Sequence, residues 1–134
     1  MKSKDSQALC AFQDKVSELL LRHRSILDSL SKHAESTARV NRAITKTVTG
    51  CGCISVHARK KELPPDFSLD DYRKHMDSHL EGQLCESCND VIEQELGNHL
   101  FYLAALCHLL DYQLDDLFER EHNRLKTLGY FRLS

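Results

Sequence analysis

The chain has 134 residues, an apolar content of 41% and a formal net charge of −2 at pH 7. These values predict one domain with a single core, covering residues 1–134. The sequence has no apolar run of the roughly 18 residues needed to cross a bilayer, and the segment Met1–Asp14 is polar and charged rather than a secretion signal. We therefore expect a cytoplasmic protein that does not enter membranes.

Apolar residues recur at three- and four-residue steps along much of the chain, which is the pattern of amphipathic helices. The pattern predicts an all-α fold, a bundle of four to five helices with antiparallel neighbours. Helices are expected over residues 7–32, 34–48, 68–75, 87–112 and 114–128. The helix at 87–112 is apolar on nearly every side of its second half, so it must be surrounded.

Glycines and capping residues predict local structure in the middle of the chain. Gly50 and Gly52 end the second helix. Ser68, with Asp71 three residues later, caps the short third helix. The intervening loop contains both prolines of the chain and should include a short extended piece at residues 54–56.

Four of the six cysteines form two closely spaced pairs, which are separated by 31 residues: Cys51-Gly-Cys53 and Cys85-Glu-Ser-Cys88. A cytosolic chain keeps its thiols reduced, so metal or redox chemistry is favoured over disulfides. Zinc takes four ligands tetrahedrally, and one ion bound by both pairs would anchor the loop at about residues 49–88 to the start of a helix. We therefore predict a structural zinc site with Cys51, Cys53, Cys85 and Cys88 as ligands. Four sulfur ligands leave no open position for a catalytic water.

Other interpretations of the cysteines stay open. The Cys-x-x-Cys pair also has the spacing of thiol–disulfide chemistry, and the thiols can simply be free or buried. His57 and His79 lie near the two pairs and could replace one cysteine ligand. The remaining cysteines, Cys10 and Cys107, have apolar neighbours at helical spacing and are expected in the core.

Charge is distributed unevenly along the chain. From Ser36 to Lys61 there are six basic residues and no acid, whereas fourteen acids lie between Asp66 and Glu121. A basic stretch of this kind can attract phosphate or nucleic acid. The same stretch could equally well balance the negative charge of a zinc–thiolate centre and pair with the acidic half of the chain. Since no aromatic residue interleaves the stretch, nucleic-acid binding is disfavoured.

The segment Glu95-Leu-Gly-Asn-His-Leu-Phe-Tyr-Leu-Ala-Ala-Leu106 resembles the third helix of the MazG-like nucleoside triphosphate pyrophosphohydrolases, in which Glu-Leu-Gly-Asp precedes an apolar, aromatic-containing run. Phe12-Gln-Asp-Lys-Val-Ser-Glu-Leu19 looks like the first helix of that family, and Leu114-Asp-Asp-Leu117 fits the last. The resemblance follows helix order over most of the chain. It implies a MazG-like helical fold, with the cysteine pairs on an insertion between the second and third helices. It also implies a homodimer or higher homo-oligomer.

Members of that family hold magnesium with Glu-Glu-x-x-Glu on the second helix and Glu-x-x-Asp on the third. In this chain Glu95 is kept, but Asn98 stands at the aspartate position, and Arg39 and Arg42 stand where carboxylates belong. Glu35 is the one acid available on the second helix, so a conventional magnesium cluster cannot form. The resemblance therefore implies a ligand pocket made by these five residues, in which the arginines meet nucleotide phosphates directly or pair with nearby acids.

Three functions are consistent with these features. The first is a zinc-binding, non-catalytic MazG-like module that binds a nucleotide or a partner and acts in regulation. The second is an active nucleoside triphosphate pyrophosphohydrolase whose rearranged magnesium site uses Glu35, Glu93, Glu95 and Asn98. The third is a zinc-stabilised nucleic-acid-binding protein. We favour the first, because the carboxylates that magnesium requires are not all present.

Overall fold

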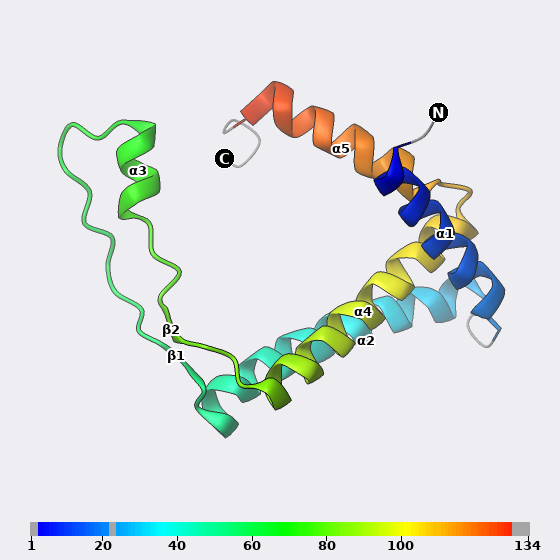
Figure 1. Cartoon of the computed structure of the whole chain (residues 1–134), viewed down its shortest axis with the longest axis horizontal. Coiled ribbons are helices and arrows are strands. Elements are labelled where there is room, and N and C mark those ends of the chain that lie inside the picture. The colour runs from blue at the N-terminus through cyan, green and yellow to red at the C-terminus, as the bar shows by residue number, and fades with distance from the viewer. Residues whose placement is uncertain (1–2, 22–23, 130–134) are drawn as a thin grey trace. The chain divides into compact units, whose positions relative to one another are not determined.

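Helices make up most of the structure, a computed structural model that describes residues 3–21 and 24–129 (Figure 1). Within those residues the α-helices are α1 (Lys4–Leu19), α2 (Ile26–Lys46), α3 (Leu69–His75), α4 (Glu86–Leu109) and α5 (Leu114–Leu128). A π-helical turn, η1 (Thr47–Cys51), follows α2, and β1 (Ile54–Val56) pairs with β2 (Leu80–Gly82) in a small antiparallel sheet. The predicted all-α fold class is confirmed.

The contacts divide the chain into two units. The first comprises residues 1–39 and 95–134, and the second comprises residues 40–94. The first unit holds α1, α5, the first part of α2 and most of α4, and the second holds the two strands and α3. None of the described helices combines the length and apolar character that a membrane span requires. The single domain expected over residues 1–134 stays a prediction.

The core of the first unit joins α1 to α4. The buried cluster consists of Val16, Leu20, Ala104 and Ala105, with Phe101, Leu109 and Leu114 packed against it. The two alanines carry no side chain beyond Cβ, so they allow the neighbouring helices to approach closely. Each buried aliphatic side chain such as Val16 contributes about 1.5–3 kcal/mol relative to an exposed position.

A buried glutamine fastens the turn between α4 and α5. The Gln13 side chain, on α1, is 5% exposed. Its Nε2 donates to the backbone oxygen of Tyr112 at 2.7 Å, and its Oε1 accepts from the backbone N–H of Leu114 at 2.8 Å. The residue at the N-cap of α5, Gln113, makes no side-chain cap of its own. Gln13 therefore satisfies a helix-terminal N–H that would otherwise lack a partner.

The continuous helix expected over residues 7–32 is wrong. Helix α1 ends at Leu19 and α2 begins at Ile26. At Leu20 the backbone leaves the helical conformation, with φ −77° and ψ 78°, while the side chain stays buried in the core. Both segments carry the same three- and four-residue apolar spacing, so periodicity alone does not locate the break.

Helix α2 buries small polar residues rather than its leucines. Ser29 and Ser36, seven residues apart, are fully buried, whereas Leu27 and Leu30 are 71% and 48% exposed. The last part of the apolar face expected over residues 7–32, which includes these two leucines, therefore contributes little to the core among the described residues. Helix α4 is likewise not surrounded by the described residues, since Leu100 is 52% exposed.

The second unit is built around the two short strands and α3. The extended piece expected at residues 54–56 is confirmed as β1, which pairs with β2 so that Ile54 lies opposite Gly82. Ser68 and Asp71 form the expected capping box at the start of α3. Gly82 has φ 94°, and a Cβ built there would lie 2.5 Å from the backbone oxygen of Cys53. A larger residue at Gly82 would therefore push apart the strands next to the cysteines.

Replacing Gln13 with leucine is expected to lower the free energy of unfolding by about 2 kcal/mol, because the Tyr112 carbonyl and the Leu114 N–H lose their partner in a buried place. Chemical denaturation monitored by circular dichroism measures the change. The matched control is Gln7→Leu, the same substitution at an exposed position of the same helix. Equal stability losses for the two variants would contradict the role assigned to Gln13.

Candidate metal centre

The structure brings the four predicted cysteines together. Cys51 ends η1 and Cys53 precedes β1, while Cys85 directly precedes α4 and Cys88 lies in its first turn. Pairing of β1 with β2 holds the two chain segments side by side, so both cysteine pairs meet at the same end of the sheet. All four sulfur atoms lie within 4.8 Å of one another. The four cysteines could therefore share one metal ion.

The distances between the sulfurs suit a tetrahedral metal better than a disulfide. The Sγ atoms of Cys51 and Cys85 are 3.8 Å apart. Two ligands at about 2.3 Å from a tetrahedral zinc ion would be separated by about 3.8 Å, whereas a disulfide requires about 2.05 Å. All six cysteines are free thiols. The donor set of four sulfurs is that of a closed structural zinc site.

The thiols shift one another's proton affinity in opposite directions. The backbone N–H of Cys88 donates to Sγ of Cys85 at 3.4 Å, and this bond is the main cause that lowers the pKa of Cys85 to about 7. Hydrogen bonding with Cys85 raises the pKa of Cys88 to about 12. Clustered thiols cannot all become thiolates without a balancing positive charge. A bound metal cation would supply that charge.

Neither histidine considered as a substitute ligand belongs to the cluster. Within the described residues the metal-ligand group consists of the four cysteines. His57 Nε2 lies instead 3.2 Å from Ser55 Oγ and 3.5 Å from a carboxylate oxygen of Glu81. Cys107 is buried, as expected for a core thiol, and burial raises its pKa. Cys10 is partly buried and also lies outside the cluster.

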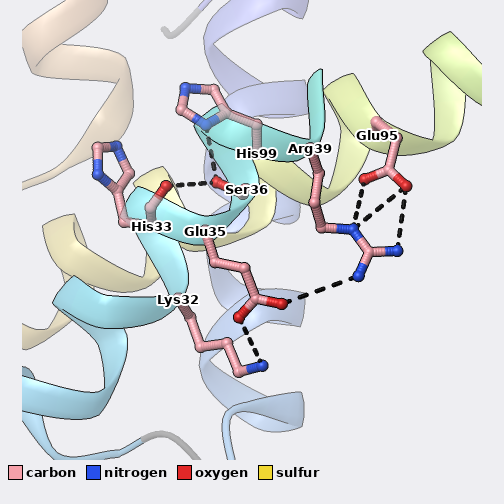
Figure 2. A network of polar contacts seen from close by, with 7 residues as sticks. All are labelled: Lys32, His33, Glu35, Ser36, Arg39, Glu95 and His99. Atoms are coloured by element: carbon pink, nitrogen blue, oxygen red, sulfur yellow. Dashed lines mark hydrogen bonds and ion pairs between the residues drawn. The ribbon is translucent and has the colours of Figure 1, made fainter. Parts of the chain in front are cut away.

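Three residues of the predicted ligand pocket meet in the first unit (Figure 2). Arg39 Nε donates to the carboxylate oxygens of Glu95 at 3.0 and 3.3 Å, and Arg39 Nη2 donates to Oε1 of the same group at 3.2 Å. Arg39 Nη1 lies 3.8 Å from Glu35, whose other oxygen accepts from Lys32 Nζ at 3.0 Å. The hydrogen bonds to Glu95 are the main cause that raises the pKa of Arg39. The arginine thus binds the Glu95 carboxylate through three hydrogen bonds.

The structure does not bring the other two pocket residues into this network. Arg42 belongs to the second unit, and Asn98 is exposed on α4. Their part in a ligand pocket stays a prediction.

Sequence reasoning missed a buried polar contact next to the arginine network. Ser36 Oγ donates to the backbone oxygen of His33 at 2.7 Å and lies 2.9 Å from His99 Nδ1 (Figure 2). The rings of His33 and His99 are 5.1 Å apart between centroids. These residues come from two helices that are distant in sequence, so no local spacing could have indicated the contact.

Comparison of the chain with protein-family models, with curated proteins and with solved structures finds no match.

The purified protein is expected to carry about one metal ion per chain, and Cys88→Ser is expected to lose most of it, because three sulfurs hold the ion less tightly than four. Elemental analysis by mass spectrometry measures the metal content. Cys10→Ser is the matched control, since Cys10 lies outside the cluster. A full metal load in Cys88→Ser would argue against the site, as would a metal-free wild-type protein that stays metal-free after exposure to zinc.

Proposed function

We propose that the chain is a zinc-binding protein in which one Zn²⁺ bound by Cys51, Cys53, Cys85 and Cys88 has a structural role. The single observation that supports this most strongly is the convergence of the four sulfurs within 4.8 Å. Sulfur ligands favour zinc over magnesium or calcium, and a four-sulfur set leaves no coordination position for substrate. A reducing compartment such as the cytoplasm would keep these thiols available to the metal.

The second part of the proposal is that the chain is a MazG-like relative without pyrophosphohydrolase activity, which works as a nucleotide- or partner-binding regulatory module. The pairing of Arg39 with Glu95 supports it. A guanidinium held at 3.0 Å supplies the positive charge that magnesium would supply beside this carboxylate. A nucleotide phosphate bound nearby would then meet the arginine rather than a metal ion.

The alternative is an active pyrophosphohydrolase with a rearranged magnesium site, and one observation favours it. The carboxylates of Glu35 and Glu95 both lie against the same cation, Arg39, at 3.8 and 3.0 Å. Two acids from different helices thus converge on one point, as magnesium ligands do. In this alternative the arginine would have to move aside for the metal.

Removal of zinc with a high-affinity chelator is expected to lower the Tm by roughly 10 °C, as a loss of about 3 kcal/mol would in a domain of this size. Hydrogen exchange should accelerate in residues 47–88 more than in α1 and α5, because the metal anchors that segment. Differential scanning calorimetry and exchange mass spectrometry measure the two effects. The Cys88→Ser variant should show no further change on chelation, and an unchanged wild-type Tm would refute a structural zinc ion.

The second part predicts no magnesium-dependent release of pyrophosphate from any nucleoside triphosphate in a broad panel. It also predicts that Arg39→Ala binds Mg²⁺ several-fold more tightly than the wild type, because the substitution removes the guanidinium that pairs with Glu95 and lies beside Glu35. Titration calorimetry with MgCl₂ measures the affinity, and Lys46→Ala is the control, because it removes one positive charge from the same helix outside the predicted pocket. Pyrophosphate release by the wild type would establish the alternative instead.

We also propose that the chain forms a homodimer or higher homo-oligomer through α4. Leu96, Leu100 and Leu103 recur at steps of four and three residues and are 45%, 52% and 37% exposed. This is the spacing of a helix seam that packs against another helix. Exposed leucines at such spacing would lower the free energy of the chain when a second copy covers them.

The wild type is therefore expected to have about twice its monomer mass of 15.4 kDa in solution, as measured by light scattering after gel filtration. The double variant Leu96→Asp/Leu100→Asp should be monomeric, because buried carboxylates oppose association. The control carries the same changes at Leu125 and Leu128 of α5, which are exposed to a similar degree, 45% and 44%. A monomeric wild type at micromolar concentration, or dissociation by the control alone, would contradict this interface.

A further inference from the structure

The segment that connects β1 to β2 forms a basic cavity that the proposed function does not use. It includes α3 and is drawn in green in Figure 1. The cavity has a volume of about 770 Å³, and the positively charged or imidazole side chains that line it are Arg59, Lys60, Lys61, Lys74, His75 and His79. All of them belong to the second unit. We propose that this cavity binds a small phosphate-bearing anion.

The lysines of the cavity have few acidic partners of their own. Arg59 lies 3.6 Å from a carboxylate oxygen of Asp77, so these two charges offset each other. Neither Lys60 nor Lys74 has an ion-pair partner among the described residues. One further acid, Glu62, lines the cavity. Three lysines against one carboxylate leave a positive field that an anion of charge −2 or more would neutralise.

His79 also lies in the lining of the cavity. Its Nδ1 is buried and has no hydrogen-bond partner in the described structure, so a water-sized group in the cavity does not reach this atom. The ring can therefore meet a ligand through its other, exposed edge alone. His79 also has φ 60°, an uncommon conformation for a residue other than glycine.

The backbone of His79 is held in that conformation from both sides. Its N–H donates to Asp77 Oδ1 at 3.1 Å, and its carbonyl accepts from the N–H of His57 at 2.8 Å. Local strain that the surroundings maintain is common at ligand sites.

The chemistry of the lining is suited to a phosphate group. Lysine ammonium groups are point-charge donors that bind phosphate oxygens from several directions. In His75 the Nδ1 lies 2.8 Å from the backbone oxygen of Asp71, which leaves Nε2 available to a ligand. A volume of about 770 Å³ lies within the range for small-molecule sites and would accommodate a nucleotide as well as inorganic phosphate or pyrophosphate.

The cavity is attached to the metal centre through both ends of its segment. Cys53 lies one residue before β1, and Cys85 lies three residues after β2. Metal binding would therefore fix the spacing of the chain ends that carry the lysines. The inference does not rest on the arginine network at Glu95, because it concerns other residues in the other unit.

The test is titration calorimetry of the zinc-loaded full chain, at constant ionic strength, with inorganic phosphate, pyrophosphate and a nucleoside triphosphate as separate probes. We expect at least one of these probes to bind, and Lys60→Ala/Lys74→Ala to weaken that binding about tenfold or more. The order of the three affinities distinguishes free phosphate from a nucleotide as the ligand class. Circular dichroism and zinc content should be unchanged in the variant, since both lysines are exposed.

The charge-matched control is Lys15→Ala/Lys126→Ala, which removes the same charge from α1 and α5. Equal weakening by both double variants would reduce the effect to overall charge and overturn the proposal. Absence of binding by all three probes would also overturn it. If a probe binds the cavity while Arg39→Ala binds Mg²⁺ no more tightly than the wild type, the cavity proposal is supported. The proposal that Arg39 takes the place of magnesium is then refuted.

Discussion

The meeting of four sulfur atoms is the interaction on which the second unit depends. Among residues 40–94 the buried side chains are those of Ala43, Thr47 and Ile54, too few to form a hydrophobic core of ordinary size. Closing the 31-residue segment between the cysteine pairs costs on the order of 3 kcal/mol in chain entropy. Two strands of three residues cannot offset that cost alone. A metal bound by four thiolates would offset it and would also remove the repulsion among the sulfurs.

The first unit is held together differently. It has an apolar cluster around Val16 and a buried glutamine, Gln13, which joins α1 to the turn between α4 and α5. Its polar network on α2 and α4 places the guanidinium of Arg39 3.0 Å from Glu95, the carboxylate to which the proposed MazG-like relationship would assign magnesium. Arg39 is about half exposed, so this pair adds little to stability. Its interest lies in the charge that it places next to a carboxylate.

The sequence could predict the features that depend on neighbours within a few residues. The two cysteine pairs, the capping box at Ser68 and the extended piece at residues 54–56 all follow from local spacing and residue type. That the two pairs meet, across 31 residues, was predicted from the four ligands that zinc requires. The break at Leu20 could not be predicted, because no proline or glycine marks it and the apolar spacing continues on both sides. Strand β2 was missed because residues 80–82 have no pattern of their own and become a strand by pairing with β1.

Contacts between distant segments account for the other features that the sequence did not indicate. Gln13 is one polar residue among many on α1, and its role appears when Tyr112 and Leu114 are seen to lie beside it. The exposed leucines on α2 are a similar case. Periodicity assigns them to a face, but it does not reveal whether this chain or another one covers that face.

The basic cavity is a local arrangement rather than a consequence of a basic unit. Residues 40–94 contain seven lysines and arginines and nine acids, so the second unit is slightly acidic overall. Four thiolates around a divalent metal would add further negative charge. Three of the lysines nevertheless lie with Arg59 around one cavity instead of being spread among the acids. Their mutual repulsion raises the free energy of the segment. An anion bound in the cavity would lower that free energy by neutralising the repulsion. The feature that indicates a ligand is therefore the cavity and not the net charge of the unit.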